Sequence, residues 1–291
     1  MNLIIPLVSS NNLLLSLRRS KFFYNLQVKE AIKEFINNNP AVEFKTEEVV
    51  KYINQRLGSD YGTGEVLSIL RELMLEREIP EYFEVVDKDT ARPTGILKQR
   101  DAIHREGDWH LAVSILIFDK EGNLLLQKRA PHVAEPNRWE ASASGHIAPG
   151  ETPREAIIRE LKEEIGLELD GTDLILIGEE NQFIKVGRND VEEDGFVGDI
   201  YFHYSDNPSN NAERLTLFMY VVSDEEKKVL LSKFNEIKPE DVSEIAFKPL
   251  VELLDDLKVS FRDYSSALVM YFSHDNVVQY LKGLFVQERS K

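Results

Sequence analysis

Three glutamates, Glu160, Glu163 and Glu164, are the residues whose type and spacing most clearly indicate chemistry. On a helix with about 100° between successive residues they fall within an arc of roughly 100°. Carboxylates this close repel one another by roughly 0.2–0.5 kcal/mol per pair unless a cation neutralises them. Carboxylate oxygens suit Mg²⁺ or Mn²⁺, which bridge to substrate phosphates. The cluster predicts a divalent-cation site, although adjacent glutamates alone are more often a solvated helix face.

The helix that must carry these glutamates is bounded by its own sequence. Thr152-Pro153-Arg154-Glu155 is a capping box with proline at the first helical position, and Gly166 is a residue type that commonly ends helices. We therefore predict a helix from Pro153 to Ile165. The residues predicted to pack its apolar face on the protein body are Ile157, Ile158, Leu161 and Ile165.

The stretch from Gly145 to Leu167 follows a longer pattern that contains the glutamates. Glu151 comes five residues after Gly145, and seven further residues lead to Arg159-Glu160-Leu161-Lys162-Glu163-Glu164-Ile165-Gly166-Leu167. This resembles the Nudix box at every fixed position.

The resemblance to the Nudix box implies specific roles. Glu160, Glu163 and Glu164 would be catalytic and bind the metal, the carbonyl of Gly145 would add a ligand, and Arg159 would pair with Glu151 to hold the loop. The implied reaction uses Mg²⁺ or Mn²⁺ to offset the charge on a diphosphate and to lower the pKa of a water, while a carboxylate takes its proton.

Residues outside the box resemble the isopentenyl-diphosphate isomerase branch of Nudix proteins, from about Val86 to Phe261. The segments that carry the likeness are His104, Trp109-His110, Leu126-Gln127-Lys128-Arg129 and Trp139 to His146. It implies further metal ligands at His104, His110 and His146, although the spacing of the first two differs by one residue. A single histidine is more often a capping or packing residue. Candidate substrate contacts are Arg129, His132 and Trp139.

The chain departs from the isomerases at two places. Ser144 stands where they carry a catalytic cysteine, and Val133 and Ala134 lie near the place of a diphosphate-binding lysine. A hydroxyl is a far weaker acid and nucleophile than a thiol, so protonating and deprotonating an alkene carbon is disfavoured. The intact box carboxylates favour hydrolysis instead.

Composition limits the remaining function classes. The 291 residues include no Cys, which excludes disulfides and thiolate metal sites. A net charge of −16 disfavours nucleic-acid binding. No apolar stretch reaches the roughly 18 residues of a membrane span. We expect a cytoplasmic protein with a small-molecule diphosphate substrate, and the sequence leaves a homodimer open.

The domain organisation is predicted from changes in pattern. Residues 1–24 form an apolar arm in a segment that has basic but no acidic residues through Lys29, so a mitochondrial presequence is an alternative to packing or fraying. Residues 25–85 predict a small helical domain in a possibly winged-helix-like layout, whose acidic helices favour packing or oligomerisation over DNA binding. Lys88 to Asp101 is predicted as a connection, and residues 86–291 as a Nudix domain with a C-terminal helix.

The strands and helices of the second domain predict an α+β fold. The resemblance to Nudix proteins implies that this fold is an α/β/α sandwich around a mixed sheet. The predicted strands are His110–Phe118, Leu124–Lys128, Leu174–Ile177, Phe183–Val186, Ile200–Tyr204 and Leu215–Val222. The predicted helices after the box are Ser223–Phe234, Pro249–Leu257 and a final one within Phe261–Val286.

Three functions remain open at this point. The first is hydrolysis of a nucleoside diphosphate derivative or similar molecule, the second an isomerase-like reaction on prenyl diphosphates, and the third a non-catalytic ligand-sensing regulator. Substrate selectivity is expected in the loops Asn181 to Asp194 and Ser205 to Arg214. Candidates for a supplementary base are Glu213, Glu240 and Glu244.

Overall fold

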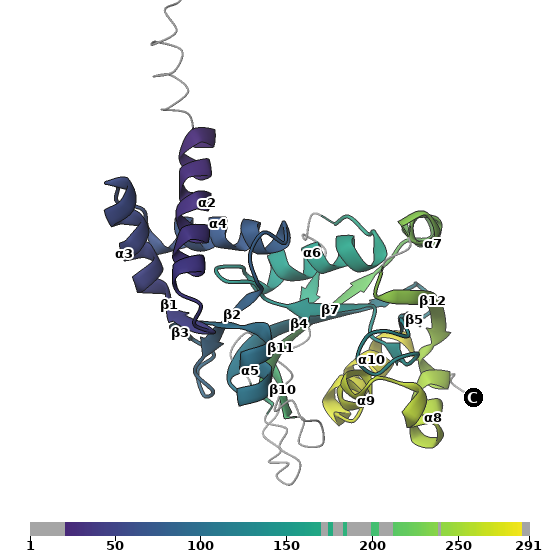
Figure 1. The fold of residues 1–291 in the computed structure, drawn as a ribbon. Helices are drawn as coiled ribbons and strands as arrows, with labels where there is room; N and C mark the ends of the chain where they lie inside the picture. Colours follow the sequence, from purple (N-terminus) through teal and green to yellow (C-terminus); the bar gives the residue numbers. More distant parts are fainter. Residues whose placement is uncertain are drawn as a thin grey trace, which may run out of the picture. The chain divides into compact units, whose positions relative to one another are not determined.

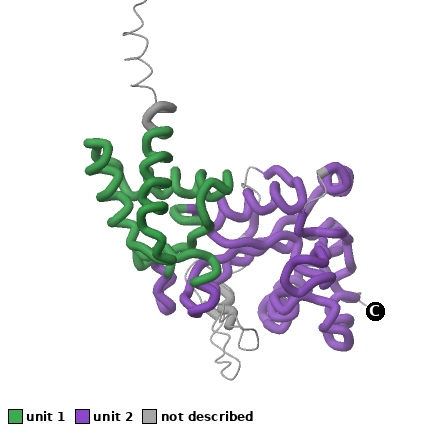
Figure 2. Tube along the Cα trace, viewed as in Figure 1, with its two compact units in different colours: residues 1–85, 93–102, 148–150 green, residues 86–92, 103–147, 151–291 purple. Residues whose placement is uncertain are grey.

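The chain folds into two compact units, each with its own hydrophobic core. The computed structural model describes residues 21–169, 174–176, 183–184, 199–203, 212–237 and 240–286. Unit 1 comprises residues 1–85, 93–102 and 148–150, and unit 2 comprises residues 86–92, 103–147 and 151–291 (Figure 2). Most of the predicted N-terminal arm and of the two predicted specificity loops lies outside the described residues.

The described residues of unit 1 form three helices and a small sheet. The order is α2 (Lys21–Asn38), β1 (Glu43–Lys45), α3 (Thr46–Leu57), α4 (Thr63–Leu75), β2 (Tyr82–Val86) and β3 (Pro93–Gln99), with strand order β1-β3-β2 (Figure 1). Val28, Ile53 and Leu70 bring the three helices into one core. Gly58 takes a left-handed conformation with φ 62° and ends α3.

The element order of unit 1 is that of a winged-helix layout, in which the third helix is the one that enters DNA. In this chain the corresponding helix, α4, presents exposed Glu65 and Glu72, and exposed Glu76 follows it. Lys29 pairs with Glu72 and Glu76 at 2.9 and 2.7 Å. An acidic surface at this position repels a phosphate backbone.

Unit 2 is built on a mixed sheet. Its central strands are β4 (Trp109–Phe118), β5 (Asn123–Arg129) and β11 (Ala212–Val221), and the path through the sheet is β12-β5-β4-β11-β10-β9. β11 runs parallel to β4, whereas β5 and β12 (Val242–Pro249) are antiparallel to their neighbours. The shorter strands are β6 (Trp139–Glu140), β7 (Ala143–His146), β8 (Ile175–Leu176), β9 (Phe183–Ile184) and β10 (Asp199–His203).

Helices cover both faces of this sheet, which confirms the predicted sandwich. Val113, Ile115 and Ile117 of β4 pack in a core with α6 (Pro153–Ile165) and α7 (Asp224–Ile237). Leu116 and Phe118 of the same strand belong to a second core. The helices that contribute to this second core are α8 (Leu250–Val259), α9 (Ser266–Tyr271) and α10 (Asp275–Phe285) (Figure 1). Because β4 is buried on both faces, its sequence is an almost continuous apolar run.

Two predictions about local structure need correction, and some elements were not predicted. The segment predicted as a connection, Lys88 to Asp101, contains strand β3, whose Pro93 and Gly95 obscured its period. The predicted final helix is divided into a 3₁₀ turn (Phe261–Asp263), α9 and α10, because Ser265 caps α9 by accepting a hydrogen bond from the Leu268 amide at 3.1 Å. Strand β12 and helix α5 (Arg100–Glu106) were not predicted.

The described part of the chain contains no helix with both the length and the hydrophobicity needed to cross a bilayer.

Asp119 holds together the turn between the two central strands of unit 2. Its buried carboxylate accepts hydrogen bonds from the amides of Glu121 and Asn123 at 3.1 and 2.8 Å and pairs with Lys227 Nζ of α7 at 2.5 Å. Burial alone would raise the pKa of Asp119, but Lys227 and Asn123 lower it below its usual value. The stabilisation is therefore present above the unfolded pKa of about 3.9 and is lost as the pH falls through the folded pKa.

We expect Asp119→Ala to lower the free energy of unfolding of unit 2 by about 2–4 kcal/mol, because it leaves buried donors without an acceptor. Urea unfolding followed by tryptophan fluorescence measures this, since both tryptophans, Trp109 and Trp139, lie in unit 2. Lys120→Ala is the matched control, because the ion pair of Lys120 with Asp224 is exposed. Equal stabilities of the two variants would contradict this role for Asp119.

Candidate metal centre

Helix α6 has the bounds and caps that its sequence predicts. The Thr152 side chain accepts a hydrogen bond from the Glu155 amide at 3.2 Å, and the Glu155 carboxylate accepts one from the Thr152 amide at 2.9 Å. Gly166 ends the helix with φ 70°. Since Ile157, Leu161 and Ile165 are buried, the helix is fixed in rotation and its other faces are free to carry charge.

Arg159 ties the loop before α6 to the helix. Its Nε and Nη2 donate to the two carboxylate oxygens of Glu151 at 3.0 and 2.9 Å, and Nη2 also donates to the backbone carbonyl of His146 at 3.0 Å. Glu151 is almost fully buried, so a bidentate partner is needed to offset the cost of burying its charge. The expected ion pair between Arg159 and Glu151 is therefore present.

Gly145 leaves the space that the Glu160 carboxylate occupies. A Cβ atom at residue 145 would lie 2.0 Å from Glu160 Oε1, so a side chain here would displace that group. Glu160 also accepts a hydrogen bond from Arg159 Nη1 at 2.6 Å. Burial raises the pKa of Glu160 to about 7, despite the opposing effect of Arg159.

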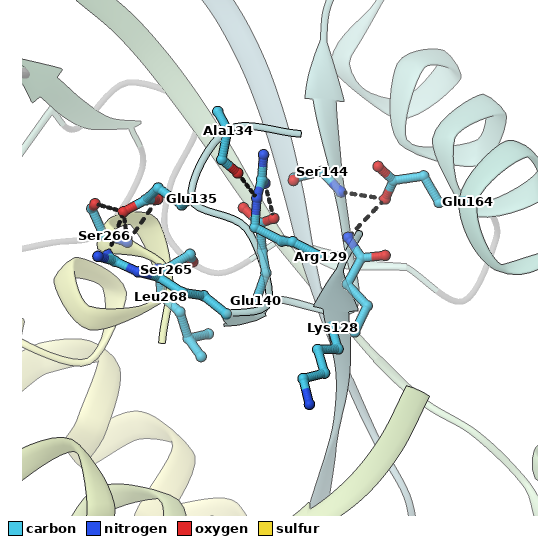
Figure 3. A network of polar contacts seen from close by, with 12 residues as sticks. Lys128, Arg129, Ala134, Glu135, Glu140, Ser144, Glu164, Ser265, Ser266 and Leu268 are labelled. Atoms are coloured by element: carbon cyan, nitrogen blue, oxygen red, sulfur yellow. Dashed lines mark hydrogen bonds and ion pairs between the residues drawn. The ribbon is translucent and has the colours of Figure 1, made fainter. Parts of the chain in front are cut away.

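Glu164 lies deeper and faces strands β5 and β7 (Figure 3). Its Oε2 accepts hydrogen bonds from the backbone amide of Ser144 and from the side-chain amide of Gln127, both at 3.1 Å. Burial, together with the charges of Glu160 and Glu140, raises the pKa of Glu164 well above its usual value. Glu163 differs from both, because its side chain is 53% exposed and its contact with Arg159 is 3.4 Å long.

A second group of ligand atoms adjoins the first. The Nε2 atoms of His104 (α5) and His110 (β4) are 3.2 Å apart, and His146 Nε2 (β7) lies 3.0 Å from Glu213 Oε1 (β11). One ligand atom from each of these four residues lies within 4.8 Å of the others. Burial alone would raise the pKa of Glu213, but hydrogen bonds with His110 and His146 lower it well below its usual value.

The backbone orients this histidine group. His110 Nδ1 lies 3.1 Å from the carbonyl of Asp108, so a proton on Nδ1 would place the ring's lone pair on Nε2, the atom that would bind a metal ion. The strand register explains why the residues meet, since Glu213 pairs with His110 across β11 and β4, and His146 pairs with Ala112 across β7 and β4. The structure therefore brings together all three histidines predicted as candidate ligands.

Glu213 is the one residue of this group of four that the sequence did not predict as a metal ligand. It was a candidate for a supplementary base only, because the parallel pairing of β11 with β4 is not visible in the sequence. The other two candidates for that role are exposed, and Glu244 lies 3.7 Å from Lys128 Nζ.

The three residues predicted to contact substrate lie in different environments. Arg129, at the end of β5, donates from Nε to the carbonyl of Ala134 at 2.5 Å and from Nη1 to Glu140 (Figure 3). Trp139 is half-buried, and His132 is exposed with its Nε2 3.3 Å from Asp241. Burial alone would lower the pKa of Arg129, but the charges of Glu140, Glu135 and Glu164 raise it above its usual value.

The chain is similar to a known protein family over most of unit 2. A family model described as NUDIX domain matches residues 108–268. The matched region includes the glutamates of α6 and Glu213. It also includes His110 and His146, whereas His104 precedes it.

Sequence relatives give the same family name. The chain is 41% identical over 91 residues to Nudix hydrolase 3 of Arabidopsis thaliana, which covers 31% of this chain and 12% of the relative. It is 32% identical over 119 residues to a Nudix hydrolase of Clostridium acetobutylicum, which covers 40% of this chain and 55% of the relative. The chain thus spans less than two thirds of both relatives.

The chain is also similar to a protein named as an isomerase and to a solved structure. Over 143 residues the chain is 29% identical to an isopentenyl-diphosphate Delta-isomerase of Pectobacterium atrosepticum, with 48% of this chain and 76% of the relative covered. The crystal structure of a protein from Deinococcus radiodurans covers 66% of this chain and 98% of its own, with 16% identity and a TM-score of 0.44.

Replacement of Gly145 tests whether the close approach of Glu160 forms a cation site. We expect Gly145→Ala to weaken Mn²⁺ binding by at least about tenfold, because displaced groups around a metal ligand typically cost 10–100-fold in affinity. Calorimetric titration with Mn²⁺ measures this, and circular dichroism checks the fold. Gly283→Ala in α10 is the control, since a Cβ there meets nothing within 4 Å. Equal Mn²⁺ affinity in the two variants would exclude the site.

Proposed function

We propose, from the premise that the chain belongs to the NUDIX family, that it is a divalent-metal-dependent hydrolase that cleaves a diphosphate linkage in a nucleoside diphosphate derivative or a similar small molecule. Nudix hydrolases of Arabidopsis thaliana and Clostridium acetobutylicum are among its sequence relatives. The family sets the reaction class. The residues of the candidate metal centre support the metal dependence.

The pair of partly buried carboxylates, Glu160 and Glu164, is the observation that carries the proposal. Burial raises the pKa of both groups, and the charge of Glu160 raises that of Glu164 further, so the pair is electrostatically unfavourable without a neighbouring positive charge. A divalent cation would relieve both effects, since it pairs with the charged form of each carboxylate. Arg159 cannot do so for both, because its hydrogen bonds go to Glu151, Glu160, Glu163 and the His146 carbonyl.

The donor atoms fit the cations that the family uses. Glu160, Glu164, the carbonyl of Gly145 and the more exposed Glu163 offer only oxygen, which suits Mg²⁺ or Mn²⁺. His104, His110, His146 and Glu213 offer nitrogen and oxygen, which suits Mn²⁺ or another transition ion better than Mg²⁺. We propose the oxygen group as the Mg²⁺ site and the histidine group as a second cation site.

The chain's own residues have distinct tasks in this reaction. A bound cation supplies positive charge that offsets the diphosphate and lowers the pKa of the attacking water. Arg159 and Glu151 keep the loop closed on the helix, and Gln127 and the Ser144 amide orient Glu164. Arg129 binds a phosphate group. As the new P–O bond forms and the bridging P–O bond breaks, the water's proton passes to a carboxylate of this centre.

Isomerisation of a prenyl diphosphate is the second candidate, and the histidine group favours it. The relative from Pectobacterium atrosepticum is named as an isopentenyl-diphosphate Delta-isomerase. Ser144 argues against this reaction because the backbone amide of Ser144 binds Glu164, while its hydroxyl lacks the acidity of a thiol. Product analysis distinguishes the two reactions directly.

A substrate panel with matched variants tests the proposal. Nucleoside diphosphate derivatives, dinucleotides and prenyl diphosphates are assayed with Mg²⁺ in the native chain, Glu164→Gln and Glu168→Gln. We expect Glu164→Gln to lower turnover of the hydrolysed substrate by at least ~100-fold with the fold intact, because it removes the charge from a metal ligand. Glu168, which lies beyond the helix and is exposed, should tolerate the same substitution.

Two outcomes would refute parts of this assignment. Full turnover in Glu164→Gln would remove Glu164 from the metal site. Rearranged prenyl diphosphate without release of phosphate or pyrophosphate would replace hydrolysis by isomerisation.

A further inference from the structure

The guanidinium group of Arg129 is held on two of its three nitrogens. Nε donates to the carbonyl of Ala134 at 2.5 Å, and Nη1 donates to the Glu140 carboxylate. Among the described residues, Nη2 has no hydrogen-bond partner. The Arg129 side chain is 24% exposed, so part of it reaches the protein surface.

Glu140 is buried beside this arginine. Its side chain is 8% exposed, and Arg129 is the residue with which it pairs. Burial raises the pKa of Glu140, and the positive charge of Arg129 partly offsets this. A buried carboxylate costs several kcal/mol unless it is paired, so Glu140 in turn restricts Arg129 to one position.

The same short strand connects Glu140 with the metal-binding glutamates. Glu140 of β6 pairs in register with Gln127 of β5, and Gln127 donates to Glu164. Arg129 lies two residues after Gln127 on β5, so the side chains of Arg129 and Gln127 extend from the same face of the strand. Arg129 is therefore on the face of β5 that contacts Glu164 of the proposed cation site.

The loop that follows β5 is also held by contacts other than this ion pair. Backbone hydrogen bonds join Arg129 N to Arg138 O at 2.9 Å and Asn137 N to Arg129 O at 3.1 Å. Glu135 binds Arg138 at 2.6 Å and the Ser266 amide of α9 (Figure 3). With the loop already anchored at both ends, the remaining effect of Glu140 is on the orientation of Arg129.

We propose that Glu140 is a positioning residue that fixes Arg129 with its Nη2 edge directed to a phosphate group of the substrate. This inference rests on the proposed function, because it requires a diphosphate at the centre. A preorganised arginine binds more tightly than a mobile one, since the entropy of ordering its long side chain is lost on folding and not on binding. Glu140 thereby affects substrate affinity without contacting the substrate.

A double-mutant cycle on pyrophosphate binding tests this role. Calorimetry with inorganic pyrophosphate and Mg²⁺ gives Kd for the native chain, Glu140→Gln, Arg129→Met and the double variant. We expect Kd to rise about tenfold in Glu140→Gln, as for loss of one charge-assisted hydrogen bond. Because Glu140 acts through Arg129, the double variant should bind no more weakly than Arg129→Met alone. For a hydrolysed substrate, KM should rise with little change in kcat.

Controls separate positioning from stability. Arg138→Met removes a half-buried arginine of the same loop that does not pair with Glu140, and should leave Kd unchanged. Arg129→Lys keeps the charge, so it is the variant to use if Glu140→Gln does not fold, and it should raise Kd because lysine lacks the guanidinium edge.

Different results would contradict the role of Glu140 and the proposed function. An unchanged Kd in folded Glu140→Gln, or in Arg129→Lys, overturns the inference, as does an additional loss of affinity in the double variant. Failure of the native chain to hydrolyse any substrate of the panel would instead contradict the proposed function.

Discussion

The proximity of Glu160 and Glu164 inside unit 2 is the constraint on which the rest of the centre depends. Both carboxylates are partly buried and have raised pKa values, an arrangement that is unfavourable without compensation. The surrounding structure supplies part of it. Gly145 has no side chain, which leaves room for the Glu160 carboxylate, and Arg159 donates a charged hydrogen bond to Glu160. The Ser144 backbone amide and the Gln127 side chain donate to Glu164. The negative charge of Glu160 and Glu164 that these groups do not compensate is the basis for proposing a cation.

A repeated device surrounds this centre, in which an arginine is paired with a buried glutamate. Arg159 pairs with Glu151 on α6 and its preceding loop, and Arg129 pairs with Glu140 on β5 and β6. The two pairs differ in what remains free. Arg159 also binds Glu160, Glu163 and a carbonyl, so its role is structural, whereas Arg129 keeps an edge available for a ligand. This difference separates the group that builds the site from the group proposed to bind phosphate.

Local features were predictable from the sequence, and features that depend on strand register were not. Helix α6 carries its own caps in Thr152 and Gly166, so its bounds and the shared face of its glutamates follow from spacing alone. Glu213 joins the histidines only because β11 runs parallel to β4, a pairing between distant segments. Strand β3 was mistaken for a connection because Pro93 and Gly95 resemble a loop until β1 and β2 pair with it. The contact of Arg129 with Glu140 likewise depends on the pairing of β5 with β6.

The central claim is that Glu160 and Glu164 share a divalent cation, and anomalous diffraction tests it most directly. Crystals of the full chain grown with Mn²⁺ would be measured on both sides of the manganese absorption edge. The account predicts an anomalous peak bonded to oxygens of both glutamates, whether or not a second peak lies among the histidines. Manganese at His104, His110, His146 and Glu213 alone, with both glutamates unbound, would contradict it.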